Sequence, residues 1–219
     1  MVCRVISGRQ PGSGRRGPGR PVHADAARTR ARILKAGYEV VNERGYAATT
    51  LQEIARRSGL SRPTLNYYFA GRDQLYCELL EHANKGLAAC IAEAKRHDAA
   101  LDQLQVFIDA VVAMWQRERE IVRFLVNARL DVYRHPGLPT DTVVAARAFL
   151  GEVVARAVER RELLPHGSPD VLTDLLHSML WGIGAYIGWQ RHDADLSKIA
   201  GQLALLIGAG LPRPVDGDR

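Results

Sequence analysis

Cysteine is scarce in this sequence, and long apolar runs are missing. The three cysteines, Cys3, Cys77 and Cys90, are odd in number and form no CxxC pair, which predicts a reducing compartment without disulfides. The longest charge-free stretch near the C-terminal half, residues 178–190, is too short to cross a bilayer, and the N-terminus has no apolar run of signal-peptide length. We therefore expect a cytoplasmic protein that does not associate with a membrane.

Motifs that carry catalysis or hold a metal are also missing. The sequence contains no HExxH, GxSxG or P-loop motif, and its seven histidines are scattered, with no Cys/His cluster at metal-ligand spacing. The segment GSGRRG (residues 12–17) has the GxGxxG spacing of dinucleotide sites, but Pro11 and Pro18 flank it where such a site needs a strand and a helix. The sequence therefore predicts no enzyme, no cofactor and no metal.

Acidic residues are few in the N-terminal third, where positive charge collects. Residues 1–75 hold 14 Arg and Lys against 5 Asp and Glu, a net charge of +9, whereas residues 76–219 hold 16 against 19, a net charge of −3. The two values add to the net charge of +6 for the whole chain. A basic segment on an otherwise mildly acidic protein is typical of a nucleic-acid-binding domain, although a solvated basic surface would have the same charge.

No strand pattern is convincing, and the chain divides into an arm and a long helical region. Residues 1–24 are rich in Gly, Pro and Arg and carry no acid, which predicts a flexible basic arm. Its Gly-Arg-Pro segment at Arg20 suits the minor groove of A·T-rich DNA, but an unstructured tail is an equally good interpretation. The helical pattern beyond the arm predicts an all-α fold, with domains at 25–72 and 73–211 and a tail at 212–219.

Residues 25–72 have the pattern of a helix-turn-helix. A first helix with one buried stripe stops at Gly45. A second helix starts at Thr50, whose side chain we expect to form a reciprocal capping box with Glu53. A glycine-containing turn follows, and Ser61 caps a third, short helix. Helix, tight turn and helix in this order predict a DNA-binding domain.

The third helix separates core residues from residues that can meet DNA. Leu65 and Phe69 are spaced i, i+4 and face the core. The exposed side and the N-terminal end of a recognition helix touch base edges in the major groove, which we expect here for Arg62, Pro63, Thr64 and Asn66. Tyrosine hydroxyls and an arginine can reach phosphates, which we expect for Tyr67, Tyr68 and Arg72. A small helical bundle whose tyrosines merely pack is the other interpretation.

Residues 33–76, ILKAGYEVVNERGYAATTLQEIARRSGLSRPTLNYYFAGRDQLY, resemble the DNA-binding domain of the TetR family of bacterial transcriptional regulators. The matching landmarks are Gly45-Tyr46, Thr49-Thr50, Ile54-Ala55, Gly59-Leu60-Ser61, Thr64-Leu65, Tyr68-Phe69 and Arg72-Asp73-Gln74-Leu75. The resemblance implies that phosphates are held by Thr50, Tyr67, Tyr68 and Arg72, and that bases are touched by Arg62, Pro63, Thr64 and Asn66. Asn66 and Arg72 stand where the family commonly has tyrosine and lysine, and an asparagine there can read adenine.

The remaining chain reads as helices at about 72–97, 100–117, 118–134, 140–161, 169–191 and 195–209. Each of the last two helices has a leucine-rich face and a second face with small residues, such as Gly184 and Gly188. A helix with two apolar faces needs two partners, which predicts a homodimer through the last two helices of each subunit. A monomer that buries both faces internally is the alternative.

The resemblance also implies an effector cavity in this larger helical domain, and the scarcity of charge predicts a small apolar ligand. The residues that could line such a cavity are Trp115, Phe124, Phe149, His177, Trp181 and Tyr186, with Asp174 as a further polar group. Aromatic residues at helical spacing more often form plain core, however.

We conclude from the sequence that the protein regulates transcription by binding double-stranded DNA at a palindromic operator. It is expected to act as a repressor that a small-molecule ligand releases. The alternative is a ligand-independent or non-specific DNA-binding protein, which would be basic as well but would not need an acidic, dimerising two-thirds.

Overall fold

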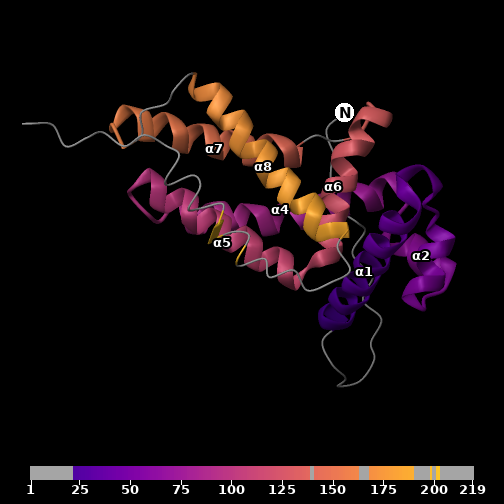
Figure 1. Ribbon diagram of the computed structural model, residues 1–219. Helices are drawn as coiled ribbons and strands as arrows, with labels where there is room; N and C mark the ends of the chain where they lie inside the picture. The colour runs from indigo at the N-terminus through magenta and orange to yellow at the C-terminus, as the bar shows by residue number, and fades with distance from the viewer. Residues whose placement is uncertain (1–21, 139–140, 163–167, 190–197, 199–200, 203–219) are drawn as a thin grey trace, which may run out of the picture. The chain divides into compact units, whose positions relative to one another are not determined.

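The computed structural model describes residues 22–138, 141–162, 168–189, 198 and 201–202, and these residues contain helices and no strands (Figure 1). The helices are, in chain order, α1 (Val22–Ala48), α2 (Leu51–Ser58), α3 (Arg62–Tyr68), α4 (Arg72–Ala94), α5 (Ala100–Arg117), α6 (Arg119–Arg134), α7 (Asp141–Glu159) and α8 (Pro169–Trp189). The all-α class predicted from the sequence is confirmed. Among the described residues, no helix is long and apolar enough to cross a membrane.

The chain forms two compact units, and neither of them is one continuous stretch. The smaller unit comprises Met1–Glu81 and Leu130–Pro139, and the larger one comprises His82–Arg129 and Thr140–Arg219. Helices α4 and α6 therefore each contribute residues to both units. The domain boundary expected after residue 72 falls at the start of α4, whereas the smaller unit extends along that helix to Glu81.

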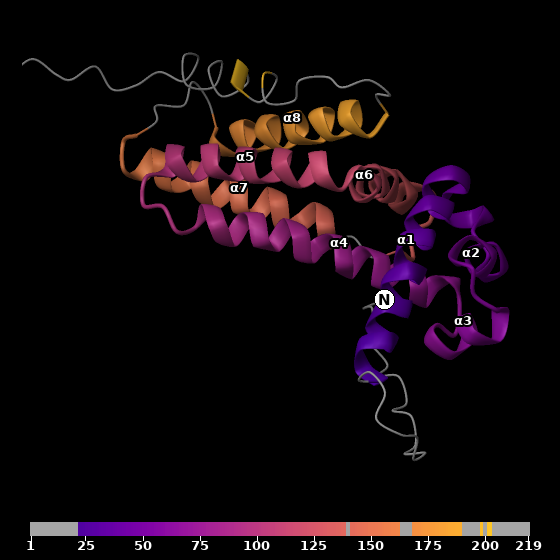
Figure 2. The same ribbon diagram turned by 90° about the horizontal axis from the view of Figure 1, so that it is seen from below.

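Helices α1, α2 and α3 pack around the core of the smaller unit (Figure 2). The predicted stripe of α1 is buried, with Ile33, Val40 and Val41 at most 1% exposed. Ile54 of α2 and Leu65 of α3 are also fully buried. Burial of one such side chain stabilises the fold by about 1.5–3 kcal/mol, so a few apolar residues hold two helices that are too short to be stable alone.

Side-chain caps begin both helices of the helix-turn-helix. Thr50 Oγ1 accepts a hydrogen bond from the backbone N–H of Glu53 at 3.2 Å, and Ser61 Oγ accepts one from the N–H of Thr64 at 3.2 Å. The expected return bond from the Glu53 side chain is not formed, because its carboxylate binds Arg56 at 2.6 Å instead. The predicted cap by the Thr50 side chain is therefore present, but the predicted return bond from the Glu53 side chain is wrong.

Two glycines adopt backbone conformations that other residues avoid. Gly45 has φ 75° and ψ 168° and interrupts α1 at the predicted stop. Gly59 has φ 65° and ψ 32° and ends α2 in a left-handed cap. The conformation of Gly45 is essentially restricted to glycine. The glycine-dependent turn predicted at Gly59 is confirmed. At Gly45 the positive φ is confirmed, but the expected left-handed conformation is wrong, because its ψ is extended.

Helices α5, α7 and α8 pack with the C-terminal part of α4 in the larger unit (Figure 2). At its centre the rings of Phe107 and Phe149 lie 4.8 Å apart between centroids. The ends of α4 to α8 agree with the predicted helices to within a few residues. The predicted helix at 195–209 lies outside the described residues apart from positions 198, 201 and 202, and so does the arm up to residue 21.

The prediction that the chain has no disulfide is wrong. Cys77 of α4 is disulfide-bonded. The prediction failed because an odd number of cysteines does not prevent two of them from pairing. Cys90 is a buried free thiol, and its burial raises its pKa. Since the thiolate is the reactive form, Cys90 acts as a core residue.

Candidate nucleic-acid interface and apolar cavity

The N-terminal end of α3 presents polar side chains to the surface. Arg62, Pro63 and Asn66 are exposed, whereas Leu65 points into the core. Thr64 is half-buried, and its hydroxyl lies 2.7 Å from that of the capping serine. Three of the four side chains predicted to touch bases are therefore exposed, on a helix that a buried leucine anchors.

Thr50 and two adjacent tyrosines flank this exposed face. Tyr67 is 62% exposed and Tyr68 is half-buried, and their rings meet edge to face with centroids 5.4 Å apart. Thr50 is exposed at the N-terminal end of α2, where backbone N–H groups and the helix dipole favour anions. The residues Thr50 and Tyr67 are thus open to contact with phosphates, and Tyr68 is partly open.

The guanidinium of Arg72 is supported by Tyr46. Its Cζ lies 4.3 Å from the centroid of the Tyr46 ring, and its Nη1 donates to the carbonyl of Ala47 at 2.8 Å. The Tyr46 hydroxyl donates to Asp73 Oδ1 at 2.9 Å. Burial of the phenol, and next this hydrogen bond, raise the pKa of Tyr46, so its hydroxyl remains protonated. The sequence showed Tyr46 as a family landmark but gave no sign that it holds Arg72.

A buried pair connects α4 with the end of α6 inside the smaller unit. The Tyr76 hydroxyl donates to Asp131 Oδ2 at 3.4 Å, and both residues are buried. Desolvation and the nearby carboxylate raise the pKa of Tyr76 far above its ordinary value, so the phenol stays protonated. The contact could not be predicted from the periodicity of either helix, because the two residues are far apart in the sequence.

The arginines of α2 are paired with carboxylates. Arg57 donates two hydrogen bonds to Glu43, of 2.8 and 2.7 Å, and Arg56 binds Glu53. The guanidinium groups hold the pKa of both Glu43 and Glu53 below its ordinary value. Arg62 on α3, in contrast, makes no ion pair within the part of the chain that the structure describes, so its guanidinium is available to a ligand such as DNA.

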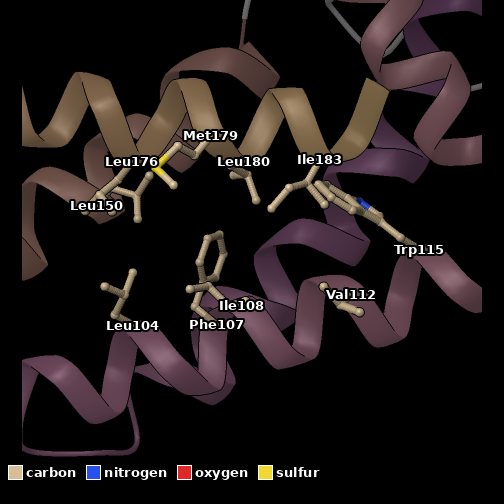
Figure 3. A pocket seen from close by; sticks show the side chains of 10 residues that line it. All are labelled: Leu104, Phe107, Ile108, Val112, Trp115, Leu150, Leu176, Met179, Leu180 and Ile183. Carbon is tan, nitrogen blue, oxygen red and sulfur yellow. The ribbon is translucent and has the colours of Figure 1, made fainter. Parts of the chain in front are cut away.

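An apolar cavity lies between α5 and α8 in the larger unit (Figure 3). It is lined by ten side chains: Leu104, Phe107, Ile108, Val112 and Trp115 of α5, Leu150 of α7, and Leu176, Met179, Leu180 and Ile183 of α8. Its volume is about 20 Å³, close to the room that one water molecule needs. A larger ligand would enter only if side chains such as the flexible Met179 move aside.

The aromatic residues predicted for an effector site are divided between the cavity, the core and the surface. Trp115 lines the cavity. Phe124 is fully buried in α6, and Phe149 belongs to the core beside Phe107. Tyr186 is exposed on α8. The mostly aliphatic lining was missed because its spacing on α5 and α8 is that of an ordinary core face.

The other two predicted residues, His177 and Trp181, form a hydrogen-bonded pair on α8. Trp181 Nε1 donates to His177 Nε2 at 2.8 Å, so this nitrogen acts as an acceptor and carries no proton. The Arg129 guanidinium carbon lies 5.0 Å from the centroid of the Trp181 ring. The exposed Asp174 instead forms an ion pair with Arg147 at 2.7 Å. Within the described residues, no group of three metal-ligating side chains comes together.

Known proteins share this architecture. A profile described as "Bacterial regulatory proteins, tetR family" matches residues 33–79. The HTH-type transcriptional repressor NicS of Pseudomonas putida is 30% identical over 132 residues, which are 59% of each chain. The HTH-type transcriptional repressor BepR of Brucella suis is 25% identical over 174 residues, 74% of this chain and 82% of BepR. This chain thus spans about three fifths of NicS.

The fold of the whole described chain also has a counterpart among solved structures. The ketosteroid transcriptional regulator KstR2 of Mycobacterium tuberculosis superposes with a TM-score of 0.72 at 19% identity, over 84% of this chain and 95% of KstR2. That structure shares the all-α fold, with the helix-turn-helix followed by a larger helical unit. By the matched residues and by the geometry of α2 and α3, the N-terminal helix-turn-helix domain of this chain belongs to the TetR family of bacterial transcriptional regulators.

Proposed function

We propose that this protein is a sequence-specific transcriptional repressor whose helix α3 reads an operator in the major groove of DNA. The observation that carries the proposal is the exposure of Arg62 and Asn66 on a helix anchored by the buried Leu65. Arginine can bind guanine O6 and N7 with two hydrogen bonds, and asparagine can bind adenine N6 and N7 in the same way. The two side chains thus supply the donors and acceptors that base recognition requires.

Phosphates on either side of the bases are bound by Thr50, Tyr67, Tyr68 and Arg72. Arg72 donates from Nη1 to the carbonyl of Ala47 and from Nε to Asp73 Oδ1 at 3.4 Å, and it stacks on Tyr46. Its remaining N–H donors are left for a phosphate. Because its position is already fixed by these contacts, less side-chain entropy is lost when it binds DNA.

The repressor acts as a homodimer, formed through the last two helices of each subunit, on a near-palindromic operator. One face of α8 supports this: Val171, Leu175, Tyr186 and Trp189 are 44–67% exposed and recur at helical spacing. Large exposed apolar patches are characteristic of interaction surfaces. Two-fold symmetry places the two α3 helices about 34–36 Å apart, one turn of DNA.

A small, largely apolar effector releases the protein from its operator by entering the cavity between α5 and α8. The cavity of about 20 Å³ is too narrow for such a ligand, so binding requires a conformation in which the lining side chains have moved. A ligand that binds only this conformation shifts the protein towards it.

The proposed function can be tested by titrating the dimer with DNA from upstream of its own gene and with random DNA. We expect Asn66→Ala to lose about 1–3 kcal/mol of discrimination at one base position. We expect Arg72→Ala to weaken binding to all DNA and to lower the salt dependence by about one phosphate. Equal binding to both DNAs by the unmodified protein would instead support the non-specific alternative, and a monomer that binds one half-site tightly would contradict the dimer.

A further inference from the structure

Two arginines of α6 have guanidinium nitrogens that are buried and unpaired. Arg123 Nε and Arg129 Nη1 have no hydrogen-bond partner in the described part of the chain, and neither has Oδ1 of Asn84 on α4. Neither arginine forms an ion pair with a carboxylate of the described residues. Each arginine as a whole is half-buried, but a buried N–H group without an acceptor is costly and is normally paired. The pattern is therefore typical of donors that a bound anion completes.

Both arginines lie beside α8, the helix that forms one wall of the cavity. A Cβ atom added to Gly184 would lie 3.1 Å from Trp115 Cη2, and one added to Gly188 would lie 3.3 Å from the Cα atom of Arg123. Positions 184 and 188 are four residues apart, which is about 6 Å along a helix. Arg129 contacts α8 through the ring of Trp181. One face of α8 thus leads from Trp115 at the cavity to the backbone of Arg123, and Trp181 of the same helix contacts the guanidinium of Arg129.

The side chains that line the cavity offer no ion-pair partner to a charged group of a ligand. Apart from the indole N–H of Trp115, its ten side chains are hydrocarbon, thioether or aromatic groups without hydrogen-bond donors (Figure 3). An entirely apolar effector would leave the unpaired donors of α6 unused. An effector with both an apolar part and an anionic group would satisfy both environments.

We propose that the effector is an amphipathic anion, whose apolar part enters the cavity between α5 and α8 and whose carboxylate or phosphate binds Arg123 and Arg129. This proposal rests on the effector site of the proposed function. Guanidinium N–H groups form short, charge-assisted hydrogen bonds to both kinds of oxygen anion. The apolar part enters as Met179 and its neighbours rotate, since the cavity must widen.

The test measures the binding of three ligands with the same chain length to the full-length protein without DNA, by calorimetry. These ligands are octanoate, octyl phosphate and octan-1-ol. We expect at least one of the two anions to bind, roughly tenfold or more tightly than the alcohol, because only the anion completes charge-assisted bonds. A preference for octanoate would identify a carboxylate ligand, and a preference for octyl phosphate would identify a phosphate ligand.

Variants separate a binding role of the arginines from a structural one. Arg123→Met and Arg129→Met should each weaken anion binding roughly tenfold or more and leave the weak binding of octan-1-ol unchanged. Arg123→Met should leave the unfolding temperature of the free protein unchanged or higher, because it removes a buried N–H group that has no acceptor. Arg119→Gln removes an exposed charge from the same helix and serves as the control, with unchanged binding.

Three results would overturn the proposal: neither anion binds, the alcohol binds as tightly as the anions, or Arg123→Met and Arg129→Met bind anions like the unmodified protein. Because DNA is absent from these measurements, they are independent of the operator. Intact anion binding together with a failure to bind or leave DNA would contradict the proposed function and leave this inference standing.

Discussion

Replacement of Gly45 by alanine should destabilise the smaller unit through backbone strain alone. Gly45 has φ 75° and ψ 168°, and a Cβ atom added there would meet no atom within 4 Å. Steric clash with neighbours therefore adds nothing, and the cost is that of holding alanine in a region essentially restricted to glycine, about 1–3 kcal/mol. Gly45 also directs the chain into Tyr46, the support of Arg72, so the affinity for DNA should fall as well.

Hydrogen exchange measured by mass spectrometry is the suitable assay for this prediction. The three tryptophans, Trp115, Trp181 and Trp189, all lie in the larger unit, so tryptophan fluorescence would not report on α1 and α2. The exchange free energy of the core amides in these helices should fall by about 1–3 kcal/mol. Gly71→Ala is the matched control, since Gly71 has equally open surroundings without a positive φ. Similar exchange in the two variants would refute the reasoning.

Three further perturbations follow from the structure and the sequence. Glu43 and Glu53 have pKa values held below the ordinary 4.5 by Arg57 and Arg56. The two carboxylates therefore stabilise the smaller unit above that pH, and this stabilisation is lost as the pH falls through their lowered pKa values. Hydrogen exchange measured along an acid titration should show the loss. Arg57→Gln should make the stability of the smaller unit depend less on pH. On α8, an alanine at Gly182 would meet no atom of its own subunit within 4 Å and should stabilise the helix of the monomer by about 0.8–1 kcal/mol. An alanine at Gly184 would meet Trp115 at 3.1 Å, and should lose this gain and alter tryptophan emission. Equal thermal shifts of the two variants would show that the Trp115 ring moves aside without cost. Replacement of Arg4, Arg9, Arg15, Arg16 and Arg20 by glutamine leaves every cysteine in place. It should keep the dimer and its thermal stability intact but reduce operator affinity, most at low salt, because five positive charges are removed. Identical affinities across a salt series would show that the arm has no role on DNA.

The helix-turn-helix could be predicted because its determinants are local. Thr50, Gly59 and Ser61 each act on backbone groups within four residues of themselves. The buried faces of α1 to α3 likewise repeat at helical spacing, so a single pass along the sequence finds them. Even here the partner of Glu53 was missed, because three nearby arginines compete for its carboxylate.

The cavity and the contacts of the arginines could not be predicted, because they depend on tertiary packing. Leu104 and Ile183 both line the cavity, but on their own helices they are spaced like any core residue. Arg72 stacks on Tyr46, and Arg129 stacks on Trp181. Each of these pairs joins helices distant in the chain, and no spacing rule selects one arginine among twenty-six.

The buried pair of Tyr76 and Asp131 has a consequence for how such regulators can be recombined. Because residues 130–139 belong to the same compact unit as α1 to α3, the DNA-reading part of this protein cannot be transplanted as one N-terminal segment. A chimera that joins residues 1–81 to a foreign effector-binding region would bury the Tyr76 hydroxyl without its acceptor, unless the incoming helix supplies a carboxylate at the place of Asp131. Exchange of operator specificity between relatives, in the laboratory or in evolution, therefore requires two separate pieces of the chain to be inherited together.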